Sequence, residues 1–140
     1  MKILFVDTYY DRFLKEFYRT NNSLNKKSYE NKLNKILNSF FGTSDSYSFF
    51  LKNRKIEAKD IIVNSVNLQK KWAEENDIDF SQFGSKINHR FFKLPIIGNR
   101  LSKLPGLIDI AKKQIEKYKP DILYCQDLSF FPYEILNEIK

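Results

Sequence analysis

The stretch KPDILYCQDLSFF (Lys119–Phe131) decides the fold that the sequence predicts. Pro120 cannot continue a helix and disfavours helical geometry in the residue before it, so the amphipathic run upstream must end there. The apolar run Ile122–Cys125 lacks alternation, which is typical of a short parallel strand covered on both faces. Ligands of open α/β sheets bind just beyond the carboxyl ends of such strands. The residues expected there are Gln126, Asp127, Ser129 and Phe130.

Two further apolar runs predict the rest of the sheet. Lys2–Val6 and Ala58–Asn64 also lack alternation, which favours buried parallel strands. Crossover connections between parallel strands are right-handed, so few arrangements remain. We expect Lys2–Val6 at the centre and the strand order 2-1-3. The predicted fold class is therefore α/β, a three-layer doubly wound lobe that three strands leave incomplete.

Apolar residues at helical spacing predict the helices between these strands. The expected helices are residues 12–19, 29–41, 46–52, 68–76, 85–92, 105–118 and a last one opening at Pro132. The first two form an inserted helical pair, separated by a loop at 21–27, and the third is the crossover helix. The expected N-caps are Asp11, Ser28 and Asn67, and Gly42 is expected in the left-handed region. The side chains expected to face the core include Phe40, Phe41, Tyr47, Phe50 and Leu51.

Composition narrows the class of protein. At 140 residues the chain is one domain, with room for a core but not for a two-lobed α/β enzyme. Its apolar runs fall far short of the roughly 20 residues that a membrane helix needs, and its N-terminus becomes charged too early for a signal peptide. We therefore expect a cytoplasmic protein with no integral membrane segment.

The formal charge of +7 raises the question of a nucleic-acid partner. The lysines are scattered among asparagines, and no basic run of five or more is present to follow a phosphate backbone. An AT-rich genome would encode the same mixture. We expect no nucleic-acid binding.

Few residues of the kinds that hold metals or cofactors are present. The single cysteine, Cys125, is expected to be a small buried apolar residue of its strand. The single histidine, His89, is expected on a helix surface. None of the four glycines lies in the G-x-G-x-x-G spacing that cradles a dinucleotide phosphate. We expect no cofactor and no metal.

Two aspartates end predicted strands and allow two interpretations. Asp7 and Asp127 could meet at the topological switch point and form a carboxylate pair similar to a magnesium or phosphoacceptor site. Response regulators, however, have adjacent acidic residues after the first strand, whereas Thr8 follows Asp7 here. The alternative is that both aspartates cap their own loops.

Aromatic side chains flank the same predicted crevice. Tyr9, Tyr10, Phe130 and Phe131 could stack on a sugar or an apolar acceptor, or they could fill the core. Arg12 could share that binding role, or it could be an ordinary surface arginine.

Four segments carry a resemblance to a known family. They are MKILFVDTYY (1–10), FFGTSDSYSFFLKN (40–53), IIVNSVNLQKKWAEEN (61–76) and AKKQIEKYKPDILYCQDLSFFP (111–132). In this order they resemble the first strand and loop, the first sheet-packed helix, the second strand and helix, and the helix–strand unit near the acceptor cleft of GT-B-fold glycosyltransferases of the family 4-like group. Together they cover about half of the chain.

The resemblance implies that residues 1–140 form a Rossmann-like N-terminal domain on the acceptor side of such an enzyme. The enzyme would transfer a sugar from a nucleotide-sugar to a glycan, glycolipid or other acceptor. The family's donor-binding C-terminal domain, with its donor motif, is absent from this sequence. The chain alone would then be an inactive fragment, and no catalytic residue is assigned.

The residues expected to bind the acceptor are Tyr9, Tyr10, Arg12, Gln126, Asp127 and Phe130. Many family 4-like enzymes have His-Asp where this chain has Gln126-Asp127. A glutamine amide has no pKa near neutrality, so Gln126 would position a hydroxyl rather than act as a base. Asp127 would hold an acceptor hydroxyl or its own loop.

A different class of function remains open. The lobe could be a stand-alone interaction or ligand-binding module without catalysis. Because the last strand would lack its sequence-next neighbour, we also expect an exposed sheet edge and a tendency to self-associate.

Overall fold

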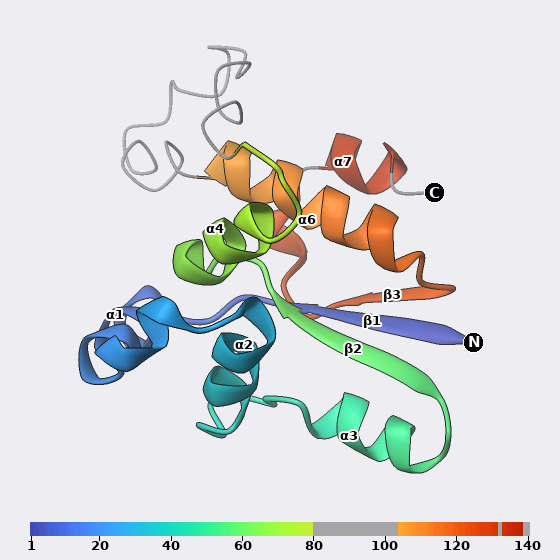
Figure 1. Cartoon of the computed structure of the whole chain (residues 1–140). Helices are drawn as coiled ribbons and strands as arrows, with labels where there is room; N and C mark the ends of the chain where they lie inside the picture. The colour runs from blue at the N-terminus through green and yellow to red at the C-terminus, as the bar shows by residue number, and fades with distance from the viewer. Residues whose placement is uncertain (80–103, 132, 139–140) are drawn as a thin grey trace.

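The computed structural model describes residues 1–79, 104–131 and 133–138, and these confirm the predicted fold class. The strands β1 (Lys2–Asp7), β2 (Glu57–Ile62) and β3 (Ile122–Cys125) form one parallel sheet in the order β2-β1-β3. Leu4 pairs with Lys59 on one side and with Leu123 on the other. Because the strands are parallel, their carboxyl ends meet at one edge of the sheet (Figure 1).

Helices cover the two faces of the sheet unequally (Figure 1). The helices α4 (Val66–Glu74), α6 (Leu104–Tyr118) and α7 (Tyr133–Glu138) lie on one face, and α3 (Ser46–Asn53) lies on the other. Side chains alternate along β1 between these faces. Leu4 and Val6 pack in a cluster with residues of α6, whereas Ile3 and Phe5 pack on the α3 side. The predicted three layers are therefore present.

The inserted helical pair consists of α1 (Asp11–Thr20) and α2 (Tyr29–Leu37). The prediction that Ser28 caps α2 is confirmed, since its Oγ accepts a hydrogen bond from the Asn31 amide at 3.4 Å. The predicted caps of α1 and α4 are wrong. Tyr10 and Ser65 are the N-cap residues, so Asp11 and Asn67 lie inside the first turns. The expected loop at 21–27 contains a 3₁₀ helix, η1 (Asn22–Lys26).

The second inserted helix ends earlier than the apolar pattern predicts. After Leu37 the chain turns, and Phe40 takes a φ of 53° with 80% of its side chain exposed, so it does not face the core as predicted. The Ser44 hydroxyl donates to the Leu37 carbonyl, which satisfies one of the carbonyls that a helix end leaves free. Gly42 is left-handed as expected, with φ 62°, but it lies beyond this turn.

The inner face of α3 also differs from the prediction. Tyr47 and Phe50 are exposed, and Leu51 is partly buried. Ser48 is fully buried instead, and its hydroxyl donates to the Asp60 carboxylate on β2. A buried carboxylate needs a hydrogen-bond partner, so this contact favours the orientation of α3 in which Ser48 faces the sheet.

The third strand is less covered than its apolar run predicts. Ile122 and Tyr124 are 46% and 48% exposed, because they lie on the α3 side of the sheet at its edge. Leu123 and Cys125 point to the other face, where they are partly buried against the α6 side. The prediction of a strand buried on both faces is therefore wrong, and the cysteine is half-buried.

The helix before this strand follows its predicted stripe. Leu107, Ala111 and Ile115 of α6 are buried, and Ile110 and Gln114 join them. The helix ends at Tyr118, and Lys119 takes a left-handed φ of 51° directly before Pro120. Helix 85–92, His89 and the opening of the last helix at Pro132 lie outside the described residues.

Candidate functional site

The candidate site lies where β1 and β3 end side by side. Val6 pairs with Cys125, and the Gln126 amide donates to the Val6 carbonyl at 2.9 Å. We define the carboxyl-edge site as Asp7, Thr8, Thr43, Gln126 and Asp127. Three of these residues follow directly from the sequence prediction, because polar residues after parallel strands gather at one edge.

The side chain of Asp127 joins the two strand ends. Its Oδ2 accepts from the Thr8 hydroxyl at 2.6 Å, and its Oδ1 accepts from the amide and the hydroxyl of Ser129 at 2.9 and 2.5 Å. The hydrogen bonds from Ser129, followed by the one from Thr8, lower the pKa of Asp127 below its ordinary value. The group is therefore an anion at neutral pH. A carboxylate has about four lone-pair positions, so one remains for a further hydroxyl.

The pKa of the second carboxylate, Asp7, is shifted in the opposite direction to that of Asp127. Burial raises the pKa of Asp7, and the nearby charge of Asp127 adds to this, although the Thr8 amide opposes it by donating to Oδ1 at 2.7 Å. Neighbouring carboxylates with pKa values displaced in opposite directions suit complementary proton-holding roles. Asp127 therefore caps its own loop, as one interpretation predicted, and its charge also acts on Asp7; a magnesium or phosphoacceptor role for the pair stays a prediction.

A threonine that the sequence did not single out as a site residue completes the edge. The Thr43 hydroxyl lies 2.8 Å from Nε2 and 3.0 Å from Oε1 of Gln126. This pair ties the loop before α3 to the end of β3. No local signal could reveal it, because 83 positions separate the two residues.

Asn64 is a second residue that sequence reasoning missed. Its side chain accepts from the Tyr9 amide at 2.9 Å and donates to the Tyr9 carbonyl at 2.6 Å. The loops after β1 and β2 are thereby held together. A polar residue directly after an apolar strand is the signal that could have indicated this position.

The predicted aromatic residues divide into buried and exposed groups. Tyr9 and Phe130 are 3% and 7% exposed, and Tyr9 packs against Phe41 with ring centroids 5.1 Å apart. Burial, with the charge of Asp7, raises the pKa of Tyr9 to about 12. Tyr10 is 77% exposed and Arg12 is also exposed. Their roles in acceptor binding stay predictions, and of these rings only Tyr10 presents most of its surface to solvent.

Groups of metal-ligating side chains and membrane-spanning helices are absent from the described residues. No group of three or more His, Cys, Asp or Glu side chains in 1–79, 104–131 and 133–138 could hold a metal ion. No helix in the same part of the chain is long and apolar enough to cross a bilayer. Comparisons with protein-family models, with curated proteins and with solved structures found no match to this chain.

Proposed function

We propose that this chain is the acceptor-side lobe of a glycosyltransferase. The proposal rests on the carboxyl-edge site. There the ionised Asp127 accepts three hydrogen bonds and can accept one more, next to the side-chain amide of Gln126. Sugar hydroxyls donate to carboxylates and both donate to and accept from amides. The resemblance of four segments to family 4-like glycosyltransferases supports the same function. These segments are 1–10, 40–53, 61–76 and 111–132.

The division of labour within such an enzyme follows from the groups that this lobe carries. Gln126 would orient an acceptor hydroxyl through its amide, and Asp127 would accept the hydrogen bond of that hydroxyl. Neither step requires a strong base, which suits an enzyme that retains configuration at the transferred sugar. The sequence lacks a glycine-rich phosphate loop, so the nucleotide-sugar would be held by a second, donor-binding lobe.

The test is a transfer assay with the protein encoded by the complete reading frame. Radiolabelled nucleotide-sugars are incubated with cell extract as the source of acceptors, and label in the product is counted. We expect transfer by the wild type and about tenfold less by Asp127→Asn, as the loss of a charged hydrogen bond implies. An Asp127→Asn enzyme as active as the wild type would remove Asp127 from the acceptor site.

One observation favours the second candidate, a stand-alone binding module. The edge strand β3 presents Ile122 and Tyr124 to solvent, next to the exposed Tyr47 of α3. Exposed apolar side chains of this kind on an edge strand suit association with a partner. Reading the coding sequence past Lys140 discriminates the two: further strand–helix units with a donor motif favour the enzyme, and a stop codon favours the module.

A further inference from the structure

Helix α3 turns aromatic rings toward solvent. Phe49 and Phe50 each expose more than half of their surface, and their rings pack edge to face with centroids 5.6 Å apart. The buried Ser48 lies on the sheet side of the helix, so neither ring is needed to cover the sheet. The half-exposed Tyr47 continues the rings toward β1, where it stacks on Phe5 with centroids 5.7 Å apart. Neighbouring exposed rings on one helix are typical of an interaction surface.

The segment that carries these rings has positive charges only. Residues 46–56 contain no aspartate or glutamate but three cations, which are Lys52, Arg54 and Lys55. Arg54 and Lys55 are exposed, and neither forms an ion pair within the described part of the chain. Of the two acids that flank the segment, Glu57 is already paired within the sheet, and Asp45 precedes the opposite end of the helix. The end of α3 therefore offers positive charge to an anionic partner.

We define the α3 surface by these rings and cations: Tyr47, Phe49, Phe50, Lys52, Arg54 and Lys55. Three half-exposed rings offer roughly 300 Å² of apolar area, which is small compared with the roughly 800 Å² that each partner contributes to a stable protein–protein interface. Bases of single-stranded nucleic acids stack on ring faces, and the edge-to-face packing of Phe49 and Phe50 leaves no continuous platform for them. A bilayer interface needs neither, because it takes apolar side chains singly, with lysine and arginine at the headgroup level.

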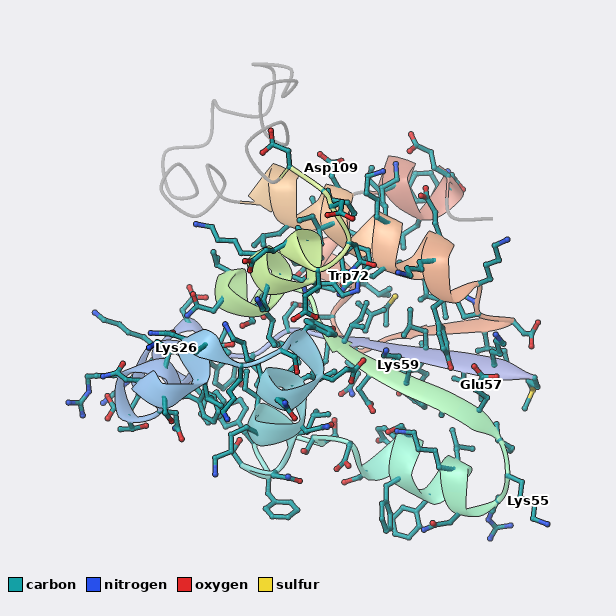
Figure 2. The ribbon with its side chains drawn as sticks, in the orientation of Figure 1. Lys26, Lys55, Glu57, Lys59, Trp72 and Asp109 are labelled. Atoms are coloured by element: carbon teal, nitrogen blue, oxygen red, sulfur yellow. The ribbon has the colours of Figure 1, made fainter. Side chains whose placement is uncertain are left out.

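We propose that the α3 surface docks this protein on an anionic membrane. Phe49 and Phe50 enter the boundary between headgroups and acyl chains, and the cations contact lipid phosphates. Figure 2 shows Lys55 in the turn after α3, where its side chain points away from the sheet. Docking does not involve residues of the carboxyl-edge site and does not depend on the function proposed for it.

The test measures binding of the 140-residue protein to vesicles by co-sedimentation. Vesicles of phosphatidylcholine mixed with phosphatidylglycerol are compared with vesicles of phosphatidylcholine alone, and an oligothymidine strand serves as a soluble polyanion. We expect binding to the mixed vesicles that weakens as salt is added, and little binding to phosphatidylcholine or to oligothymidine. Absence of binding to the mixed vesicles would leave the rings to a protein partner and overturn the proposal. Equal binding to both kinds of vesicle, or equally tight binding to oligothymidine, would overturn it too.

A double variant tests the rings. Phe49→Ala combined with Phe50→Ala removes side chains that are largely exposed, so the melting temperature should stay close to that of the wild type. The partition coefficient onto the mixed vesicles should fall at least about tenfold. The matched control is Tyr133→Ala, which removes an exposed ring from α7 on the opposite face of the sheet (Figure 1) and should bind as the wild type does. Equal partition coefficients for the double variant and the wild type would refute the assignment.

A matched pair of lysine variants tests the charges. Lys55→Gln should lower the partition coefficient about fivefold, because one basic residue near an anionic surface contributes about that much. Lys26→Gln removes the same charge from an exposed position of η1, far from Lys55 (Figure 2), and should change the partition coefficient little. Equal losses for the two variants would mean that net charge alone attracts the protein, and the α3 surface would not be its docking site.

Discussion

The strands β2 and β3 flank the same central strand and carry similar apolar runs, yet only β2 is buried. Ile61 and Ile62 of β2 are 3% and 1% exposed, whereas Ile122 and Tyr124 of β3 are 46% and 48% exposed. Residues of α1, α2 and α4 form one cluster with Ile62, while the aromatic contacts of Tyr124 within the described residues are with the rings of Phe5 and Tyr47. A continuous apolar run therefore predicts a strand, but the neighbouring helices decide whether both faces are covered.

The largest expected effect comes from matched truncations in these two strands. Ile62→Ala should lower the free energy of unfolding by about 3 kcal/mol, because it leaves a cavity in a closed core. Ile122→Ala removes the same atoms from a half-exposed position and should cost less than about 1 kcal/mol. Urea unfolding monitored by circular dichroism measures both. Equal losses would mean that β3 is covered in solution.

A buried carboxylate makes β2 sensitive to pH. Burial raises the pKa of Asp60 to about 6, although the hydrogen bond from Ser48 and the charge of Lys52 oppose this. As the pH rises through the interval between the ordinary value of 3.8 and about 6, the unfolded chain loses this proton before the folded chain does. The folded state should therefore lose roughly 2 to 3 kcal/mol of stability over that interval.

The check is the free energy of unfolding as a function of pH for the wild type and for Asp60→Asn. The variant cannot ionise at this position, so the part of the pH dependence that Asp60 causes should disappear. Burial also raises the pKa of Asp7, which leaves a smaller slope of the same sign. Identical pH profiles for the two proteins would show that Asp60 does not titrate in this range.

Asn64, which follows β2, and Asp127, which follows β3, should differ in how much they contribute to the stability of the fold. Asn64→Ala removes both side-chain hydrogen bonds to the Tyr9 main chain and should cost about 1 to 2 kcal/mol. Asp127→Asn keeps the shape of the side chain and one carbonyl oxygen that can still accept from Ser129, so it should cost less than Asn64→Ala. Thermal melts of both variants make the comparison. A loss for Asp127→Asn as large as that for Asn64→Ala would give Asp127 a structural role.

The smallest expected effect is weak association through β3. An edge strand with exposed apolar side chains can pair with a second copy, so the sedimentation coefficient should rise with protein concentration. Tyr124→Lys should abolish the rise, since a charge on an edge strand opposes pairing. The control is Asn31→Lys, which adds the same charge at an exposed position of α2. Its sedimentation coefficient should still rise with protein concentration. A wild type that remains monomeric at high concentration would contradict this prediction.

Residues with a strong local signal were predicted well from the sequence. Pro120 ends α6, Ser28 caps α2, and the three apolar runs form parallel strands in the predicted order. At the candidate site, the positions of Asp7, Gln126 and Asp127 follow from the ends of these strands. Thr8, Thr43 and Asn64 were missed as site residues, because their partners lie 119, 83 and 55 positions away.

By itself the sequence determined the three parallel strands and their order, the approximate positions of the helices among the described residues, and the edge of the sheet where Asp7, Gln126 and Asp127 gather. Interactions between residues close in sequence are sufficient to predict these features, since proline geometry, capping and hydrophobic periodicity act over a few residues. Only the tertiary structure decided which faces are buried: Ser48 rather than Tyr47 turns inward to meet Asp60, and Tyr124 stays exposed. The physical reason is that burial and hydrogen-bond satisfaction depend on residues distant in sequence, which local patterns do not encode.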